Sequence, residues 1–349
     1  MNNILQKLPG AILPWYQQNK RDLPWRKDRD PYHIWLSEIM LQQTRVEAVK
    51  GYYDRFLAAL PNIDSLASAD DEQLHKLWEG LGYYSRVRNL KKAAQRIITA
   101  HNGVFPGEYD KVLALPGIGE YTAGAICSIA FGMRTPAVDG NVLRVVARLT
   151  DDSTPIDLPA YKKQVQISLA EIYPEQAGAF TQALMELGAT VCGPNRKPDC
   201  KNCPCNGFCL GYQRNTADSL PVKSPKKERR EEEYTVFILR CGDRYALDKR
   251  SEKGLLAGLW QFPNIAGKLE LDKALSQIQN WGMSLHNLEM VLEREHIFTH
   301  ITWKMRGIYA EVTCENSDFQ WFTPTQIREE TALPTAFRQF WNEIQHTAV

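Results

Sequence analysis

Residues 111–131 read KVLALPGIGEYTAGAICSIAF, a stretch that predicts a helix, a tight turn and a second helix. Gly117 and Gly119 allow the backbone of PGIG to turn sharply, and such a turn presents the free N–H groups of the next helix to a phosphate. A lone PGIG is typical of a hairpin that only packs. With LAL before it and the small residues 122–125 after it, the stretch predicts a helix-hairpin-helix motif, which holds DNA backbone without reading bases.

Two acidic residues outside this stretch are candidates for chemistry. Asp139, in VDGNVLRVVARL (138–149), is predicted to open a helix, and taken alone Asp139 or Asn141 is typical of an ordinary N-cap. Glu38 lies among apolar residues in IWLSEIMLQQT (34–44), where burial would raise its pKa; in isolation, a glutamate on a solvated helix face is the simpler interpretation. One protonated and one ionised carboxyl group form the pair that glycoside-type bond cleavage needs.

Two further stretches suit a nucleic-acid partner. RDLPWR (21–26) places Trp25 beside Arg26, a stacking face next to a cation. GLGYYSRVRNLKK (80–92) offers Tyr83 and Tyr84 close to several basic residues, so that a tyrosine could wedge into a base stack. Aromatic residues at such spacing are also typical of a packed core. The net charge of +1 means that any nucleic acid must be held by local patches.

Five of the eight cysteines lie in CGPNRKPDCKNCPCNGFC (192–209), with the spacing C-x7-C-x2-C-x5-C through Cys192, Cys200, Cys203 and Cys209, and with Cys205 in addition. The start of the chain lacks a signal-peptide pattern and no apolar run approaches a membrane span, so we expect a cytoplasmic, nucleoid-associated protein of the bacterial type. In a reducing compartment such a cluster favours metal binding over disulfides. The spacing alone leaves zinc and a 4Fe–4S cluster as equal alternatives.

The organisation of the chain predicts two domains. A helical period runs from about residue 15 to 188, and NTADSLPVKSPKKERREEE (215–233) is charged and proline-broken, as an exposed linker is. Short β-rich runs follow: YTVFILR, RYALDKR, ITWKMRGIYAEV and FQWFTP. We therefore predict a mainly α domain over 1–214 that includes the cysteine loop 192–209, a linker over 215–233, and a smaller α+β domain over 234–349.

Taken together, these stretches resemble the MutY-type adenine DNA glycosylases. LPWR, SEIMLQQT, GLGYYSR, LPGIGEYTAGAI, VDGNV, QALMELGA, the cysteine loop and FTH occur in that family's order, between residue 15 and about 345. The resemblance implies a helix-hairpin-helix glycosylase domain with a 4Fe–4S cluster, followed by a Nudix-like domain. It also implies excision of adenine mispaired with 8-oxoguanine or guanine in double-stranded DNA, in base excision repair, by a monomer without membrane contact.

The resemblance also implies roles for individual residues. Glu38 would protonate the flipped adenine and Asp139 would stabilise the sugar cation, assisted by Tyr121 and Asn141. Gln43 and Tyr83 would fill or wedge the opened duplex. The adenine pocket would be lined by Trp25, Arg26, Leu41, Val46 and Glu186, and the cluster would be held by Cys192, Cys200, Cys203 and Cys209.

Two features depart from the family's pattern. The first two cysteines of the family usually have six residues between them and this chain has seven, so that Cys205 could replace a neighbouring ligand. The second domain resembles the Nudix fold through LLAGLWQFP (255–263), but its next helix, LDKALSQIQNWG, lacks the paired glutamates that would hold magnesium. In the family this domain recognises 8-oxoguanine, and Phe298, Thr299 and His300 of HIFTH match the loop that probes it.

Two alternatives remain at the level of the sequence. An endonuclease III-like glycosylase and lyase would need a lysine amine for a Schiff base, and its relatives carry that lysine just after the glycine turn, where this chain has Tyr121. A non-catalytic iron–sulfur DNA-binding protein would have no need of Glu38 and Asp139. These alternatives can be distinguished from an adenine glycosylase by incubating the protein with duplexes that carry adenine mispairs and then treating the DNA with alkali.

Overall fold

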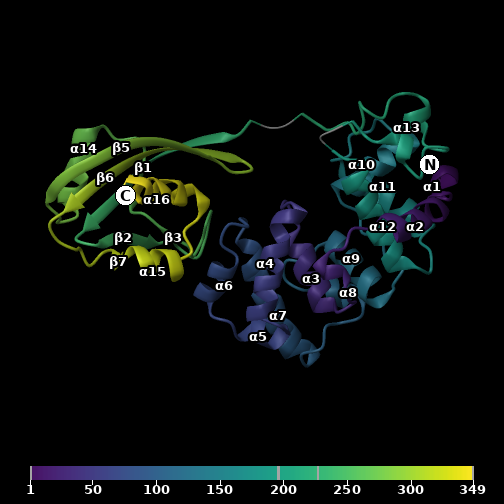
Figure 1. Cartoon of the computed structure of the whole chain (residues 1–349), viewed down its shortest axis with the longest axis horizontal. Helices are drawn as coiled ribbons and strands as arrows, with labels where there is room; N and C mark the ends of the chain where they lie inside the picture. Colours follow the sequence, from purple (N-terminus) through teal and green to yellow (C-terminus); the bar gives the residue numbers. More distant parts are fainter. Residues whose placement is uncertain (1, 195–196, 226–227, 348–349) are drawn as a thin grey trace. The chain divides into compact units, whose positions relative to one another are not determined.

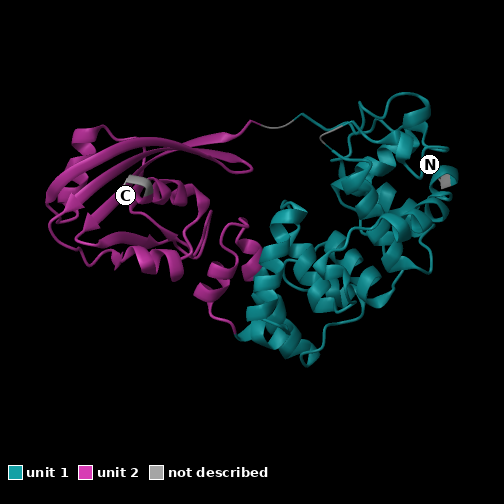
Figure 2. Cartoon of the chain, in the orientation of Figure 1, with its two compact units in different colours: residues 1–68, 89–226 teal, residues 69–88, 227–349 magenta. Residues whose placement is uncertain are grey.

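The protein, seen here as a computed structural model that describes residues 2–194, 197–225 and 228–347, divides into two compact units (Figure 2). Unit 1 comprises residues 1–68 and 89–226, and unit 2 comprises residues 69–88 and 227–349. The boundary differs from the predicted one, because segment 69–88 lies in the helical part of the sequence and yet belongs to unit 2.

Unit 1 is helical (Figure 1). Its elements in chain order are α1 (Asn2–Leu5), α2 (Leu8–Asn19), the 3-10 helix η1 (Pro24–Arg26), α3 (Pro31–Met40), α4 (Val46–Ala59), α5 (Ile63–Ser68), most of α7 (Ser85–His101), α8 (Tyr109–Leu113), α9 (Glu120–Phe131), α10 (Gly140–Thr150), α11 (Pro159–Ala170), α12 (Ala177–Thr190), η2 (Cys200–Asn202) and α13 (Leu210–Gln213). Helix α12 packs against α2, α9 and α10, and α3 packs against α9.

The helices that carry the candidate residues have clear start and stop signals. Asp30 accepts a hydrogen bond from the Tyr32 N–H at the start of α3, and Asp139 caps α10 in the same way. Helix α9 ends at Gly132, whose φ of 69° is the left-handed conformation that glycine adopts without a steric cost. The predicted turn between α8 and α9 is confirmed, since the two helices flank PGIG.

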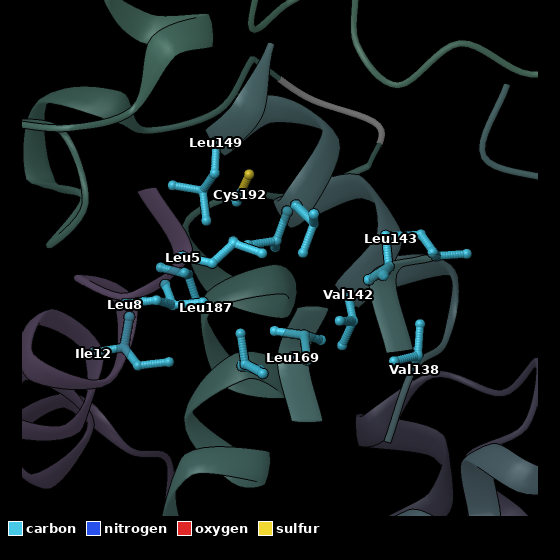
Figure 3. Close-up of a cluster of buried hydrophobic side chains, with 14 of the residues drawn as sticks. Leu5, Leu8, Ile12, Val138, Val142, Leu143, Leu149, Leu169, Leu187 and Cys192 are labelled. Atoms are coloured by element: carbon cyan, nitrogen blue, oxygen red, sulfur yellow. The ribbon is translucent and has the colours of Figure 1, made fainter. Parts of the chain in front are cut away.

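The core of unit 1 that lies nearest the cysteine loop is shown in Figure 3. Apolar side chains from α1, α2, α10, α11 and α12 form one buried cluster, which also contains Cys192, Cys205 and Cys209. Leu149 and Cys192, both labelled in Figure 3, also line a small cavity. The cysteine loop is therefore anchored on the same apolar residues that hold α10 and α12 together.

The predicted linker 215–233, of which residues 226 and 227 lie outside the described residues, is bonded to unit 1 over residues 216–224. Thr216 hydrogen-bonds to Asp151, the Leu220 carbonyl accepts from Arg148 Nε at 2.9 Å, and the Ser224 N–H donates to Asp157 at 2.9 Å, so the chain is tied to unit 1 as far as residue 224. Strand β1 (Arg230–Cys241) already begins before residue 234. The composition of this stretch is that of a linker, but side chains of α10 and of the segment after it satisfy its backbone groups.

Unit 2 contains a mixed sheet with the strand order β3-β2-β1-β6-β5, in which β4 also pairs with β1 and β7 with β2. Strands β1 and β6 are parallel and the other pairs are antiparallel. The remaining bounds are α6 (Asp71–Leu77), β2 (Arg244–Lys249), β3 (Trp260–Gln261), β4 (Asn264–Ala266), α14 (Leu271–Asn280), β5 (Leu285–Ile297), β6 (Ile301–Val312), β7 (Gln320–Phe322), α15 (Pro324–Glu329) and α16 (Thr335–Thr347). The four predicted β-rich runs all contain strands.

Alternation along β1 decides how the sheet is covered. Val236 and Ile238 belong to the core cluster that includes α16, whereas Phe237 and Leu239 belong to the cluster that includes α14. This period of two buries both faces of the sheet against helices. Among the described residues no helix of either unit is long and apolar enough to cross a membrane.

Segment 69–88 is bonded to the rest of unit 2 through its polar side chains. Lys76 Nζ donates to the carbonyls of Arg328 and Thr331 at 2.5 and 3.1 Å, and the carboxylate of Glu79 accepts from the Leu333 N–H and pairs with Arg338. In the same way Glu72 pairs with Lys249 at 2.5 Å and accepts from the Trp260 indole at 3.2 Å. These long-range contacts explain why sequence alone did not assign the segment correctly.

Candidate active site

A cavity of about 480 Å³ in unit 1 gathers most of the predicted site residues. It lies between η1, α3 and the segment after it, α9, the start of α10, and α12. The predicted residues that line it are Trp25, Arg26, Glu38, Leu41, Gln43, Val46, Tyr121, Asp139 and Asn141. Segments distant in the sequence thus supply two carboxyl groups, an aromatic face and a cation to one space.

Glu38 is a buried acid that faces this cavity. It lies on α3 among buried neighbours, is 6% exposed, and accepts a hydrogen bond at Oε2 from the Tyr121 hydroxyl at 2.8 Å. Burial raises the pKa of Glu38 to about 7; the Tyr121 hydrogen bond opposes this rise, the charge of Asp139 adds to it, and the charge of Arg26 opposes it. Around neutral pH a substantial fraction of Glu38 therefore carries a proton, which is the state that a general acid needs.

Asp139 is held in a more polar environment. Its Oδ1 accepts from the backbone N–H groups of Asn141 and Val142 at 2.9 Å each, and its Oδ2 accepts from Asn141 Nδ2 at 2.6 Å. These bonds fix the carboxyl group at the positive end of α10. Asp139 is thus an N-cap, as its position predicts, and also a fixed negative group on the cavity wall.

Glu186 lies behind the cavity wall rather than on it. Its side chain is fully buried, and its carboxylate pairs with Arg21 Nε at 2.6 Å and with Arg26 Nη2 at 2.7 Å. Burial alone would raise the pKa of Glu186, but the hydrogen bonds and charges of Arg21 and Arg26 hold the pKa below its usual value. Arg21 lines the cavity and was not singled out from the sequence; its place in RDLPWR, next to Trp25 and Arg26, was the available signal.

The remaining lining residues shape the opening and the floor of the cavity. Trp25 is buried and packs edge-to-face against Tyr53, with ring centroids 5.5 Å apart. Leu41 and Val46 flank the segment between α3 and α4, in which Gln43 is exposed and has a φ of 59°. A left-handed backbone at a non-glycine residue is a strained conformation of the kind that clusters at functional positions.

The glycine turn lies on the surface of unit 1. Gly117 has a φ of 77°, and a Cβ added there would lie 2.6 Å from Cβ of Asn89, so glycine is required on two grounds. Gly119 is the N-cap residue of α9 and makes no side-chain cap, which leaves the first N–H groups of the helix directed at solvent. Binding of DNA backbone at this turn remains a prediction.

The other predicted DNA contacts belong to unit 2. Tyr83 is 47% exposed and has a φ of 48°, and its hydroxyl lies 2.8 Å from Thr299 Oγ1. Phe298 packs edge-to-face on His296 and Trp303, while Thr299 and His300 are exposed. Unit 2 therefore brings the predicted wedge and the predicted HIFTH loop together.

All five cysteines of the loop 192–209 line one small cavity, together with Arg148. Arg148 Nη1 lies 3.3 Å from Sγ of Cys192, a position in which a cation would stabilise a thiolate. No three His, Cys, Asp or Glu side chains within residues 2–194, 197–225 and 228–347 are close enough together to hold a single metal ion. The fit to an iron–sulfur cluster therefore rests on the cysteine-lined cavity and its cationic neighbour, and these residues suit such a group.

Arg144 connects the cysteine loop to the candidate carboxylates. Its Nη2 donates to Asn141 Oδ1 at 3.0 Å and to the Gly188 carbonyl at 2.9 Å, and its Nε donates to the Cys192 carbonyl at 2.9 Å. Since Asn141 in turn donates to Asp139, one continuous set of hydrogen bonds runs from the loop to the cavity. The cysteine loop and the Asp139 carboxylate are thus linked through Arg144 and Asn141.

Two family models match this chain. Residues 36–173 match the HhH-GPD superfamily of base excision DNA repair proteins, and residues 235–343 match the NUDIX domain. Among solved structures, a thermostable thymine-DNA glycosylase is 30% identical with a TM-score of 0.56, covering 61% of this chain and 98% of that one. A trapped endonuclease III–DNA covalent intermediate is 22% identical with a TM-score of 0.52, covering 62% and 98%; this second likeness concerns the fold alone.

The curated relatives carry a common description, adenine DNA glycosylase. The human protein is 34% identical over 402 residues, with 95% of this chain and 73% of that protein covered. A Buchnera aphidicola protein is 35% identical over 302 residues, covering 86% and 84%. An Arabidopsis thaliana protein is 37% identical over 366 residues, covering 89% of this chain, which spans 57% of the length of that relative.

Proposed function

Because this chain belongs to the adenine DNA glycosylases of the HhH-GPD superfamily, we propose that it hydrolyses the N-glycosidic bond of adenine mispaired with 8-oxoguanine or guanine in double-stranded DNA. One observation carries the proposal: a buried carboxyl group with a pKa of about 7 faces the same cavity as a hydrogen-bonded carboxylate. Cleavage of this bond needs one carboxyl group that donates a proton and a second, ionised one that stabilises positive charge at the same pH.

The chain's own residues supply the proposed chemistry. Glu38 gives its proton to a ring nitrogen of adenine, the bond between C1′ and the base breaks with its electron pair going to the purine, and the sugar becomes an oxocarbenium-like cation. The fixed carboxylate of Asp139 stabilises that cation. Water then adds to C1′ and returns a proton to Glu38, which regenerates the acid.

The rest of the cavity positions the base. Adenine must leave the base stack at a cost of a few kcal/mol, which stacking on Trp25 and contacts with Leu41 and Val46 would offset. Glu186 holds Arg21 and Arg26 in the wall through its two ion pairs. In this proposal Glu186, Arg21 and Arg26 position one another, while Glu38 transfers the protons and Asp139 stabilises the sugar cation.

Excision without strand cleavage is the first expected result. Tyr121 stands where a lyase would carry its lysine, and a phenol cannot form an imine. A duplex with adenine opposite 8-oxoguanine should therefore break at the adenine position only after alkali, and borohydride should not trap the protein on DNA. The same assay is run on duplexes with adenine opposite guanine and with adenine opposite thymine. Efficient borohydride trapping of the wild-type chain would contradict the proposal of a monofunctional enzyme.

Recognition of the oxidised base is assigned to unit 2. The hydrogen bond between Tyr83 and Thr299 supports this, because it joins the proposed wedge to the loop 296–300 within one unit. The same set of duplexes provides the control: Thr299→Ala with His300→Ala should narrow the preference for adenine opposite 8-oxoguanine over adenine opposite guanine. Excision opposite guanine should persist in that variant, at one fixed salt concentration.

We also propose that Cys192, Cys200, Cys203 and Cys209 hold a 4Fe–4S cluster. These four thiolates would hold the cluster and it would cross-link the loop, at the end of unit 1 that Arg144 and Arg148 contact. Cys205 is fully buried and stands between two of these residues.

The expected iron content tests this ligand set. Protein purified without oxygen should be yellow-brown and contain about four irons per chain. Cys203→Ser should lose the colour and the iron, whereas the matched variant Cys205→Ser should retain both. Stoichiometric zinc in protein from iron-replete cells would contradict the iron assignment, and loss of iron in Cys205→Ser alone would move one ligand to Cys205.

A further inference from the structure

A second cavity lies directly beside the candidate active site in unit 1. It has a volume of about 640 Å³ and lies between the end of α2, the segment after it, the end of α9 and the start of α12. This volume is within the range of small-molecule sites, roughly 300–1,000 Å³. The two cavities share a wall made of Arg21, Arg26, Ile129 and Gln182.

The shared wall contains side chains that can move without leaving a buried charge unpaired. Arg21 is one of two partners of the buried Glu186, and the side chain of Arg21 is 35% exposed against 12% for Arg26. If Arg21 swings towards solvent, Glu186 keeps its ion pair with Arg26, and the large cost of an uncompensated buried carboxylate is avoided.

Gln182 is the second movable part of the wall. The Tyr16 hydroxyl donates to Gln182 Oε1 at 2.9 Å, and Tyr16 lines only the second cavity. The amide oxygen of Gln182 is thereby occupied, and no described residue accepts from its amide N–H groups, which remain as donors at the boundary between the two spaces. Such donors suit the ring nitrogens of a purine, which are acceptors.

The lining of the second cavity carries more positive than negative side chains. The cations are Lys20, Arg21, Arg26, Lys27 and Arg29, and the carboxylates are Asp22, Asp28 and Glu175. At the shared wall the buried Glu186 pairs with both Arg21 and Arg26 and so offsets part of their charge. A small polar ligand without charge can therefore pass this wall by hydrogen bonding alone.

We propose that the second cavity receives the free adenine base after cleavage and is the route by which the base leaves while DNA still covers the first cavity. This inference rests on the proposed function, because only a glycosylase produces a free base there. The base is small, uncharged and rich in acceptors, which matches the cavity and the Gln182 amide. Outward movement of Arg21 and Gln182 opens the wall, and the product DNA need not dissociate first.

The test follows a free base into the protein while DNA is bound. The chain is assembled with a duplex that carries a tetrahydrofuran abasic analogue opposite 8-oxoguanine, and is mixed in a stopped-flow instrument with 2-aminopurine, a fluorescent isomer of adenine. By microscopic reversibility, the route of entry is also the route of exit. The variant Ala179→Phe fills the second cavity from the first turn of α12, and Ala179 does not line the first cavity.

The expected result depends on the presence of DNA. With the duplex bound, Ala179→Phe should lower the association rate constant of 2-aminopurine at least tenfold; without DNA, when the first cavity is open, it should change that constant less than twofold. The matched control is Ala170→Phe, the same substitution at an exposed position of α11 that lines neither cavity. Tyr16→Phe, which frees Gln182, should accelerate entry into the DNA-bound protein. Ala179→Leu is a smaller filling change should the phenylalanine prevent folding.

Two outcomes would overturn the route itself. These are equal association rate constants for Ala179→Phe and the wild type in the DNA-bound state, and a DNA-bound wild type that takes up no 2-aminopurine. The alkali assay is run in parallel on the wild type with adenine opposite 8-oxoguanine. Absence of alkali-labile sites in that assay would overturn the proposed function and the inference with it, and so is distinguished from a failure of the route alone.

Discussion

Glu38→Gln is expected to lower the single-turnover rate constant of adenine excision by at least about 10³-fold, within the range that loss of a general acid produces. Glutamine has the same shape, and its amide oxygen can still accept the Tyr121 hydrogen bond that Glu38 now accepts at 2.8 Å. It has no proton to give at the pH of the reaction. Affinity for a duplex with adenine opposite 8-oxoguanine should stay within about threefold of the wild type, since the charge of a protonated acid and of an amide is the same.

The matched control is Glu47→Gln. Glu47 lies on α4, and its side chain is 76% exposed and does not line the cavity. The same chemical change there should leave excision within about twofold of the wild type. Excision by Glu38→Gln within tenfold of the wild type would show that the proton comes from another group.

The raised pKa of Glu38 also determines how the rate of adenine excision depends on pH. Excision by the wild type should be nearly constant below pH 7 and fall about tenfold per unit well above it, because the acid is then ionised.

The raised pKa of Glu38 also makes the free energy of unfolding depend on pH. A carboxyl group whose pKa rises from 4.5 to about 7 on folding makes the folded state less stable as pH rises through that interval. Glu38→Gln should therefore gain about 3 kcal/mol of stability relative to the wild type between pH 4 and pH 8, measured by urea unfolding.

Asp139→Asn is expected to lower the excision rate constant by about 10³-fold while leaving the protein folded. Asparagine caps helices as well as aspartate does, so it can keep the two hydrogen bonds from the N–H groups of Asn141 and Val142. It loses the negative charge that faces the developing sugar cation, and it also loses the Oδ2 acceptor for Asn141 Nδ2. Single-turnover excision and the melting temperature, measured on the same preparation, separate the loss of charge from a loss of structure.

Asp70→Asn provides the comparison for that variant. Asp70 caps α6 by accepting from the N–H groups of Glu72 and Gln73, so the two substitutions change the same kind of helix N-cap. Excision should be unaffected by Asp70→Asn. If Asp139→Asn and Asp70→Asn reduced excision equally, the effect of Asp139 would be one of helix stability and the electrostatic role would be wrong.

Helix caps and turn residues in the sequence predicted the elements that carry the site. The helix that carries Glu38 has an aspartate and a proline at its start, and the turn before α9 is marked by Gly117, whose positive φ and close neighbour Asn89 require a glycine. The sequence does not show whether Glu38 is buried, because its immediate neighbours on a helix do not show which face packs. Burial follows from the contact between α3 and α9, which brings the Tyr121 hydroxyl to the carboxyl group.

The features that the sequence did not reveal all depend on partners distant along the chain. Arg21 acquires its place from Glu186, and residues 216–224 are held by side chains of α10 and of the segment that follows it. Strand β5 was not predicted, because its exposed positions along the sheet edge carry several charged residues that mask the alternation. The composition of a segment indicates its structure in isolation, but the structure of these segments is determined by contacts with residues distant in the sequence.

The assembly of unit 2 from residues 69–88 and 227–349 has a consequence for synthesis on the ribosome. Leu74, Trp78 and Tyr84 are buried in the finished protein, but the partners of Glu79 and Lys76 near the end of the chain are made last. At about 5–20 residues per second, this segment waits roughly 10–50 s for them. During that interval Lys76 and Glu79 lack these partners and unit 2 is incomplete, so a holding chaperone would protect the segment. A chain terminated early within residues 227–349 would lack them permanently, and we expect it to be cleared by proteolysis or to aggregate.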